Sequence, residues 1–353
     1  IGCFILSCAD HKDYSSLPED IKNNSVSLDI DTVDIPDNLI YAREFRVYHD
    51  SILIVLNKKY DDVSFVEMYR LKDHKLIRSF FRLGNGPNEL LSALVKLNGD
   101  VLTVNDYVKN QIAFLNLDSA LANPLYNVTP IRYYTESPVA AQHLVDSQLI
   151  IENPNYFVDD NLGINTNTTR LLVADKNSIP KGSENNEYYV RNVTSDGHII
   201  VNYKLNKIIY AYMGKPIIEF YDRELKLTNR ILGPDKLPAK YKIIDKEVIY
   251  DEYIPYAYLD FCTDENYFYL TYMGTNLVAG KNMEDYPLWI FKFAWNGDFI
   301  KSYNIRRYIS SISISNNVKS FYFTGVYKDK NPILLKLSII LNFYFINTVV
   351  LNS

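Results

Sequence analysis

The chain has 353 residues, of which 47% are hydrophobic and 22% charged, and its formal net charge at pH 7 is -5. This length suits two average domains or one large all-β domain. The 30 tyrosines and 17 phenylalanines favour strands over helices. The net negative charge and the lack of a basic stripe argue against a nucleic-acid partner.

The N-terminus has the pattern of a lipoprotein signal. Its first residues, IGCFILSCADHKDYSS, run from an apolar stretch to a cysteine and then become polar. The tetrapeptide that ends at Cys8 matches a bacterial lipobox, which predicts a signal-peptide remnant over 1–7, a lipid anchor at Cys8 and a tether over 8–24. A truncated apolar tag is the alternative. The other two cysteines are Cys3, inside the predicted signal remnant, and Cys262, so neither a disulfide nor a cysteine-rich metal site is expected in the mature chain.

After residue 40 the sequence repeats one unit, an alternating strand, a short polar turn and a second alternating strand. The closest copies lie roughly 44 residues apart, which matches a propeller blade of roughly 40 to 50 residues. Each gap between copies contains a further strand, turn and strand, for example ALVKLNGDVLTVND at 93–106. The six copies are anchored by Met68, Ile112, Leu171, Ile218, Phe291 and Leu335.

These units predict an all-β fold, one six-bladed β-propeller of four-stranded antiparallel blades over residues 25–353. Because an open ring would leave edge strands, the alternating segment SVSLDIDTVDI at 25–35 is expected to pair near the last blade and close the ring. A pair of β-sandwiches or a β-helix is the alternative architecture.

A glycine-rich stretch, FFRLGNGPNELL at 80–91, lies between the first two blades. It lacks the lysine and the helix of a Walker loop, and Glu89 stands where a Rossmann fingerprint needs a third glycine. We therefore predict a structural turn, with Gly86 at positive φ. The stretch RILGPDKLP repeats its pattern after the fourth blade. The predicted blade-junction residues are Gly84, Gly86, Pro87, Glu89, Gly233 and Pro234.

The segment GNGPNE at 84–89 resembles the Gly-x-Gly-Pro-Gly-Glu signature of the TolB-like six-bladed β-propeller family of bacterial lipoproteins. The lipobox at Cys8, the strand at 25–35 and the segment NYKLNKIIYAYMGKPIIEFYD at 202–222 extend the resemblance over most of the mature chain. Asn88 departs from the family's usual glycine. The resemblance implies an envelope-anchored propeller with no established catalytic residues.

Three long insertions, at 153–168, 233–255 and 274–287, fall in loops that emerge on one face of a propeller. Insertions gathered on one face are typical of the binding face of repeat proteins, and tyrosines there suit contact with a glycan or a protein. Solvated loop decoration is the alternative. The candidate binding residues on this long-loop face are Tyr156, Phe157, Asp159, Asp160, Tyr250, Tyr253, Tyr256 and Tyr286.

Residues suited to catalysis are sparse. His198 is expected at a strand turn and His143 on a strand that lines the channel. The alternative function is a divalent-metal hydrolase of the lactonase kind, in which channel oxygens hold calcium. Its candidate ligands are Glu44, Asp106, Asn153 and Asp260.

The sequence therefore favours a non-catalytic lipoprotein of the bacterial envelope, periplasmic or associated with the outer membrane. We expect it to bind an unidentified envelope protein or glycan on its long-loop face and to use no cofactor. Its expected contact with the membrane is the N-terminal lipid.

Overall fold

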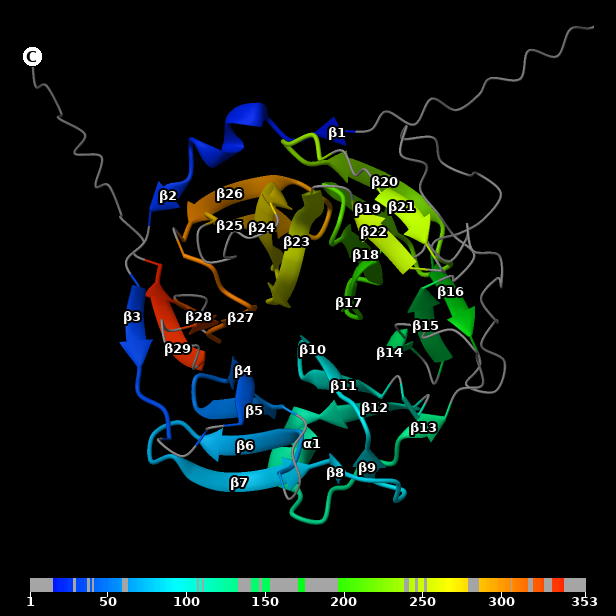
Figure 1. The fold of residues 1–353 in the computed structure, drawn as a ribbon, viewed down its shortest axis with the longest axis vertical. Helices are drawn as coiled ribbons and strands as arrows, with labels where there is room; N and C mark the ends of the chain where they lie inside the picture. The colour runs from blue at the N-terminus through cyan, green and yellow to red at the C-terminus, as the bar shows by residue number, and fades with distance from the viewer. Residues whose placement is uncertain are drawn as a thin grey trace, which may run out of the picture.

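A computed structural model describes residues 15–27, 30–36, 39, 41–58, 63–106, 108–109, 111–132, 141–145, 148–152, 171–174, 196–237, 241–244, 247–250, 253–278, 286–305, 307–316, 320–326 and 332–339. Antiparallel sheets surround a central axis, each with its first strand innermost (Figure 1). This arrangement confirms the predicted all-β propeller.

The first three sheets follow in chain order. Blade 1 contains β4 (Ala42–Tyr48), β5 (Ile52–Asn57), β6 (Val66–Arg70) and β7 (Lys75–Phe80). Blade 2 contains β10 (Leu94–Asn98), β11 (Val101–Asp106), β12 (Gln111–Asn116) and β13 (Ile131–Arg132). The described strands of blade 3 are β14 (Ala141–Val145), β15 (Gln148–Glu152) and β16 (Leu171–Ala174).

The second half of the ring has the same order. Blade 4 contains β17 (Gly197–Asn202), β18 (Lys207–Tyr212), β19 (Ile217–Tyr221) and β20 (Leu227–Leu232). Blade 5 contains β23 (Tyr253–Thr263), β24 (Tyr267–Val278), β25 (Trp289–Ala294) and β26 (Phe299–Asn304). Blade 6 contains β27 (Ser311–Ile314), β28 (Ser320–Val326), β29 (Pro332–Ser338) and β3 (Ile30–Val33).

Short elements lie between the strands of the blades. The turn between blades 1 and 2 holds the parallel pair β8 (Arg82–Leu83) and β9 (Glu89–Leu90), and α1 (Leu117–Ala122) follows β12. A separate two-stranded sheet, β21 (Tyr241–Ile244) with β22 (Glu247–Tyr250), lies between blades 4 and 5 in the chain.

The N-terminal segment runs around the rim of three blades (Figure 1). β1 (Ser15–Ser16) pairs in parallel with β20, and β2 (Val26–Ser27) pairs in parallel with β26. β3 then pairs antiparallel with β29 and supplies the outer strand of blade 6. This pairing confirms that the predicted strand at 25–35 closes the ring on the last blade.

The described part of the predicted tether is packed against the propeller. Between β1 and β2, a 3-10 helix (η1, Glu19–Lys22) places Ile21 at 3% exposure, and Leu17 is also buried. Both side chains belong to the cluster between blades 4 and 5, and Ser302 donates a hydrogen bond to the Ile21 carbonyl. From Ser15 onward this segment is therefore a strap on the rim, which corrects the prediction of a tether over 8–24.

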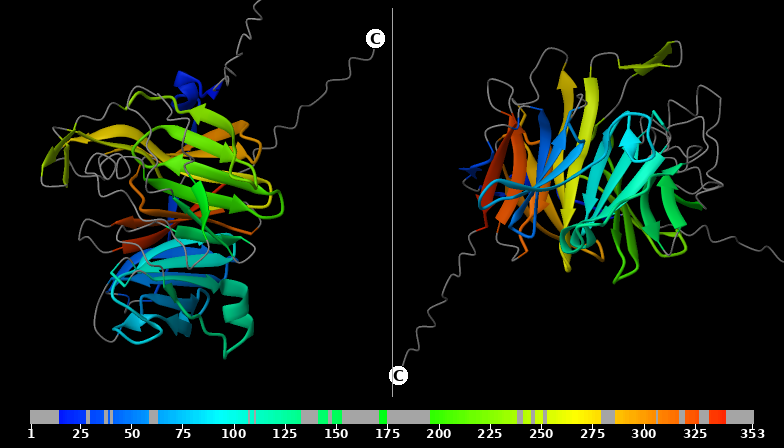
Figure 2. Two further views of the ribbon diagram at one scale, coloured as in Figure 1. Left: turned by 90° about the vertical axis from the view of Figure 1, so that its right-hand side faces the viewer. Right: turned by 90° about the horizontal axis from the view of Figure 1, so that it is seen from below.

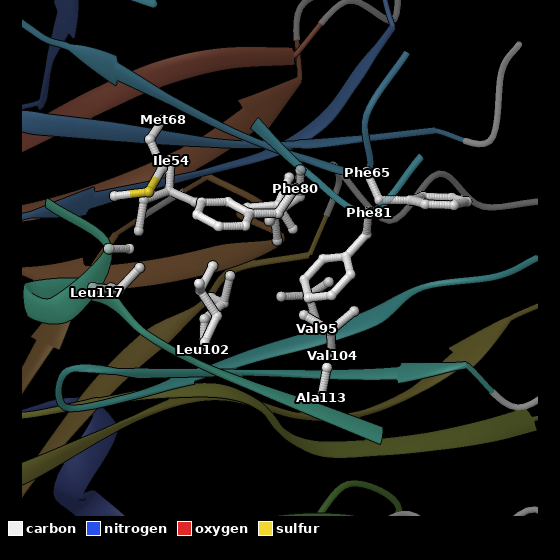
Figure 3. Close-up of a cluster of buried hydrophobic side chains, with 14 of the residues drawn as sticks. Ile54, Phe65, Met68, Phe80, Phe81, Val95, Leu102, Val104, Ala113 and Leu117 are labelled. Atoms are coloured by element: carbon white, nitrogen blue, oxygen red, sulfur yellow. The ribbon is translucent and has the colours of Figure 1, made fainter. Parts of the chain in front are cut away.

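The hydrophobic core lies between neighbouring blades, because each twisted sheet buries its apolar face against the next. Between blades 1 and 2, Ile54 and Met68 pack toward Leu102 and Leu117 (Figure 3). Phe80 lies in the same layer. Similar clusters join blades 4 and 5 and blades 5 and 6.

Candidate functional site

A charged cluster occupies the propeller axis. Arg46, in the innermost strand of blade 1, places Nη1 2.7 Å from Oδ2 of Asp260 in the innermost strand of blade 5. Its Nε donates a hydrogen bond of 2.7 Å to Glu44. The same Nη1 donates to the carbonyl of Ile312 in blade 6, whose N–H donates in turn to Asp260. Three blades are therefore linked at the axis by one guanidinium and one carboxylate.

The cluster fixes the charge of its members. Arg46 and Asp260 are both about 2% exposed. Burial opposes the ionisation of Asp260, but the charges of Arg46 and Lys96 hold the pKa of its carboxyl below the usual range. Burial also acts against the charge of Arg46, and the two carboxylates raise the pKa of the guanidinium above its ordinary value. Both groups are charged at neutral pH.

His198 belongs to this buried region. It is the second residue of β17, has no exposed surface, and lies with its ring 5.7 Å from that of Phe261. The backbone at Tyr258 and Leu259 approaches the imidazole, but neither ring nitrogen completes a hydrogen bond to a described residue. Burial, followed by the charge of Lys96, lowers the pKa of His198 to about 3. The prediction that His198 lies at a strand turn is therefore wrong.

The three candidate calcium ligands that the structure describes, Glu44, Asp106 and Asp260, have separate partners. Glu44 and Asp260 lie on either side of Arg46, so a guanidinium already supplies the positive charge between them. Asp106 instead accepts hydrogen bonds from the backbone of Leu91 and Val108 and from other groups of the loops at the end of β11. Asn153 lies outside the described residues. Within the described ranges, no group of three or more His, Cys, Asp or Glu side chains could hold a metal ion.

The glycine-rich turn is built around Glu89. Gly86 donates its N–H to the Glu89 carboxylate at 2.7 Å, and the ammonium of Lys109 lies 2.6 Å from the Glu89 carbonyl and 3.0 Å from the Gly86 carbonyl. Carbonyl oxygens and a lysine thus occupy the loop where a nucleotide loop would present backbone N–H groups. The contacts support the predicted structural turn.

Within residues 80–91 the positive φ values belong to Phe81, at 62°, and Gly84, at 153°, and Gly86 is not among the residues with positive φ. The prediction of a positive φ at Gly86 is therefore wrong. A Cβ on Gly84 would lie 2.1 Å from Glu89 Oε2. The equivalent junction after blade 4 begins at Gly233, whose N–H donates to the Pro216 carbonyl at 2.6 Å, and continues through Pro234.

The long-loop face differs from the predicted set of loops. The segment 233–255 contains the hairpin β21–β22, and the first part of 274–287 continues β24 to Val278. Tyr253 pairs with Val278 and Tyr256 with Thr275, so β23 and β24 form the longest hairpin among the described strands. These strands extend past the other blades at one face (Figure 2).

The structure describes four of the eight predicted binding residues. Tyr256 and Tyr286 are half-buried and pack against the core cluster between blades 5 and 6. Tyr250 ends β22 and Tyr253 begins β23. The remaining four, Tyr156, Phe157, Asp159 and Asp160, lie outside the described residues. The exposed apolar residues here include Ile244, at 50% exposure, and Ile254, at 42%.

The sequence analysis missed Arg46 and placed His198 at a turn instead of in an innermost strand. The segment EFRVY at 44–48 alternates polar and apolar residues, and the polar residues of such a strand usually face solvent. In an innermost propeller strand, the polar side chains of the same alternation point toward the axis. The position of Arg46 two residues after Glu44 in an innermost strand was the available signal.

No helix among the described residues is long and apolar enough to cross a membrane.

Comparisons with known proteins agree with this architecture. The sequence matches the family of TolB-like 6-blade propeller-like proteins over residues 35–317. A solved structure of a DUF4221 family member from Bacteroides vulgatus has a TM-score of 0.53 and 10% identity, and the similarity covers 89% of this chain and 98% of that one. A protein from Bacteroides fragilis described as exported has a TM-score of 0.49 and 13% identity, with 90% and 99% covered. Among curated proteins, none matches the chain.

Proposed function

The chain belongs to the TolB-like 6-blade propeller-like family, and we propose that it is a non-catalytic binding protein of the bacterial cell envelope that holds a partner protein on its long-loop face. The axial carboxylates support a role without chemistry, because Arg46 engages both Glu44 and Asp260. In this proposal the charged axis is a structural element and the extended strands provide the binding surface.

The hairpin β21–β22 is the observation that carries the proposal. It forms a two-stranded sheet that pairs with no other described strand. An isolated hairpin is only marginally stable in water, and its open edges can pair with another chain. Such a hairpin gains stability when a partner covers it.

The exposed side chains favour a protein as the partner. Ile244 lies at the end of β21 and Ile254 near the start of the extended β23, and each exposes at least two fifths of its surface. Aliphatic side chains offer little to the hydroxyl groups of a glycan, whereas they pack well against apolar protein surface.

The envelope location rests on the lipobox that ends at Cys8. A precursor with a complete signal should incorporate labelled fatty acid, and Cys8→Ser should abolish the label. Wild-type protein that is released without lipid would contradict the proposed anchoring.

The binding surface can be tested with two matched double variants. Ile244→Ser with Ile254→Ser removes the exposed side chains of the long-loop face. Leu76→Ser with Ile300→Ser removes side chains of similar exposure, 47% and 46%, from outer strands. Immobilised wild-type protein and both variants would be incubated with envelope extract.

A genuine partner should bind wild type and the outer-strand variant equally. Its affinity for the long-loop variant should fall about tenfold or more, as loss of central interface contacts commonly costs. A partner lost from the outer-strand variant alone would place the site on the rim and overturn the proposal. Circular dichroism would confirm that both variants remain folded.

A further inference from the structure

The side chain of Lys22, the last residue of η1, lies in a cage between the strap and blade 5. Its ammonium is 2.6 Å from Oδ2 of Asp235 and 3.4 Å from the carbonyl oxygen of Gly274. It also lies over two aromatic rings, 4.7 Å from the ring centroid of Trp289 and 5.4 Å from that of Tyr272. The cage thus combines a carboxylate, a carbonyl and two aromatic faces, each of which attracts a cation.

The cage is packed closely around Asp235. Tyr272 is fully buried, and its hydroxyl donates to Asp235 Oδ2 at 2.8 Å. Gly274 has a φ of 58°, and a Cβ there would overlap the Asp235 carboxylate and the Tyr272 ring. The side chains of Lys22 and Asp235 are 18% and 28% exposed, so solvent screens this pair less than a fully exposed one.

These contacts fall at the roots of two of the long insertions. Asp235 belongs to the segment 233–255, which contains the hairpin β21–β22. Gly274 begins the segment 274–287, and Trp289 begins β25 just after that segment ends. One side chain of the strap therefore contacts the bases of two insertions of the long-loop face.

The strap and the first insertion also share backbone pairing and packing. β1 pairs with the end of β20, and the Leu17 N–H donates to the Leu232 carbonyl at 2.8 Å, one residue before the insertion begins (Figure 1). Leu237 packs against the same hydrophobic cluster as Leu17 and Ile21. The strap therefore adjoins the insertion both before and after Asp235 in the sequence.

We infer that Lys22 is a positioning residue for the partner surface: it holds the bases of two insertions against the strap and so couples the strap to the long-loop face. The inference rests on the proposed binding function of that face. The strap also lies in the chain between the proposed lipid anchor at Cys8 and the blades. A displacement of the strap is therefore transmitted to the partner surface through Lys22.

Hydrogen exchange followed by mass spectrometry can test this coupling without a partner. Lys22→Met keeps an unbranched side chain and removes the charge. Amide exchange in β21–β22 and in β24 from Gly274 to Val278 should then accelerate about threefold to tenfold. The amides of β5, in blade 1, should exchange as in wild type. Because the measurement uses the protein alone, its failure is distinct from a failure to capture a partner from envelope extract.

Lys292→Met provides the matched control. Lys292 lies 3.6 Å from the ring centroid of Tyr267, at the end of β24 opposite to the insertions. Its loss should leave exchange at Gly274 to Val278 unchanged. Lys22→Arg keeps a cation that can pair with a carboxylate and lie against a ring, and it should restore part of the protection that Lys22→Met removes.

The coupling should also act in the reverse direction, because coupling between two parts of a protein is reciprocal. Asp235→Asn changes the insertion, yet it should accelerate exchange in the strap at η1. The double variant of Lys22→Met with Asp235→Asn should exchange no faster than the faster single variant, because both changes remove the same contact.

Four results would overturn the positioning role of Lys22. They are unchanged exchange at the insertion bases in Lys22→Met, equal acceleration there in Lys292→Met, equal acceleration in β5, and equal effects of Lys22→Met and Lys22→Arg. Circular dichroism would verify that each variant is folded before exchange is measured.

Discussion

Arg46 and Asp260 form an ion pair of 2.7 Å between blades 1 and 5, which are separated in the ring by blade 6. Blade 6 is included in the link, because the Ile312 carbonyl accepts from Arg46 and the Ile312 N–H donates to Asp260. The pair therefore spans the part of the ring where the last blade meets the first.

Arg46→Met should destabilise the protein by about 3 to 5 kcal/mol, because it leaves the buried Asp260 carboxylate without its closest cation. Lys96, at 3.7 Å from the other carboxylate oxygen, compensates only in part. The free energy of unfolding would be measured with urea.

The neighbouring Arg43 provides the matched control, since it is exposed and donates to the Ala93 carbonyl at 3.3 Å. Arg43→Met should change stability by less than about 0.5 kcal/mol. Adding Asp260→Asn to Arg46→Met should recover part of the loss, because an amide oxygen still accepts the Ile312 N–H. A loss below about 1 kcal/mol for Arg46→Met would show that the pair does not stabilise the ring.

His198 should make stability depend on pH. Its pKa is about 3 in the folded protein and about 6.5 in an unfolded chain. Between these values the unfolded chain binds the extra proton, so stability falls as pH falls, by at most about 1.4 kcal/mol per pH unit from this group.

His198→Phe removes the imidazole that takes up a proton in the unfolded chain, and it keeps an aromatic ring beside Phe261. The difference in unfolding free energy between pH 7 and pH 5 should therefore be smaller in the variant than in wild type. A change in packing affects both pH values alike, so it does not alter this difference. Parallel pH curves for the two proteins would refute a buried neutral imidazole.

Gly84→Ala should lower stability by about 1 to 3 kcal/mol, because it combines a positive φ with a Cβ placed against Glu89. Truncation at Glu89→Ala should reduce the cost of the Gly84 change, and a double-mutant cycle would measure this coupling. Gly99 has a φ of 60° with no atom within 4 Å of an added Cβ. The cost of Gly99→Ala should therefore not respond to Glu89→Ala.

Ile21→Ala should cost about 2 to 5 kcal/mol, because Ile21 is almost fully buried between blades 4 and 5 although it belongs to the strap. Val26, also in the strap, is 37% exposed, and Val26→Ala should cost well under 1 kcal/mol. Equal effects of the two substitutions would mean that the strap is held by its backbone pairing rather than by Ile21.

The repeat and the closing strand could be predicted because they depend on local alternation and on the need to cover an edge. Other features depend on contacts between distant residues. The continuation of β24 to Val278 depends on pairing with Tyr253, and the burial of His198 depends on its place around the axis. A Cβ on either Gly84 or Gly86 would lie within 3 Å of the Glu89 carboxylate, yet only Gly84 of the two has a positive φ. Spacing in the sequence does not encode these relationships.

The strap has a consequence for synthesis on the ribosome. Ser302 donates to a carbonyl 281 residues earlier in the chain, and β3 pairs with β29, a strand near the end of the described chain. The strap emerges before the blades. β1 can pair once β20 emerges, but β2 waits for β26 and β3 waits for β29. Neighbouring blades can assemble as they emerge, whereas ring closure waits for the whole repeat. A nascent chain stalled before β29 would therefore leave β3 unpaired and the outer edge of β28 uncovered, and both could pair with another chain.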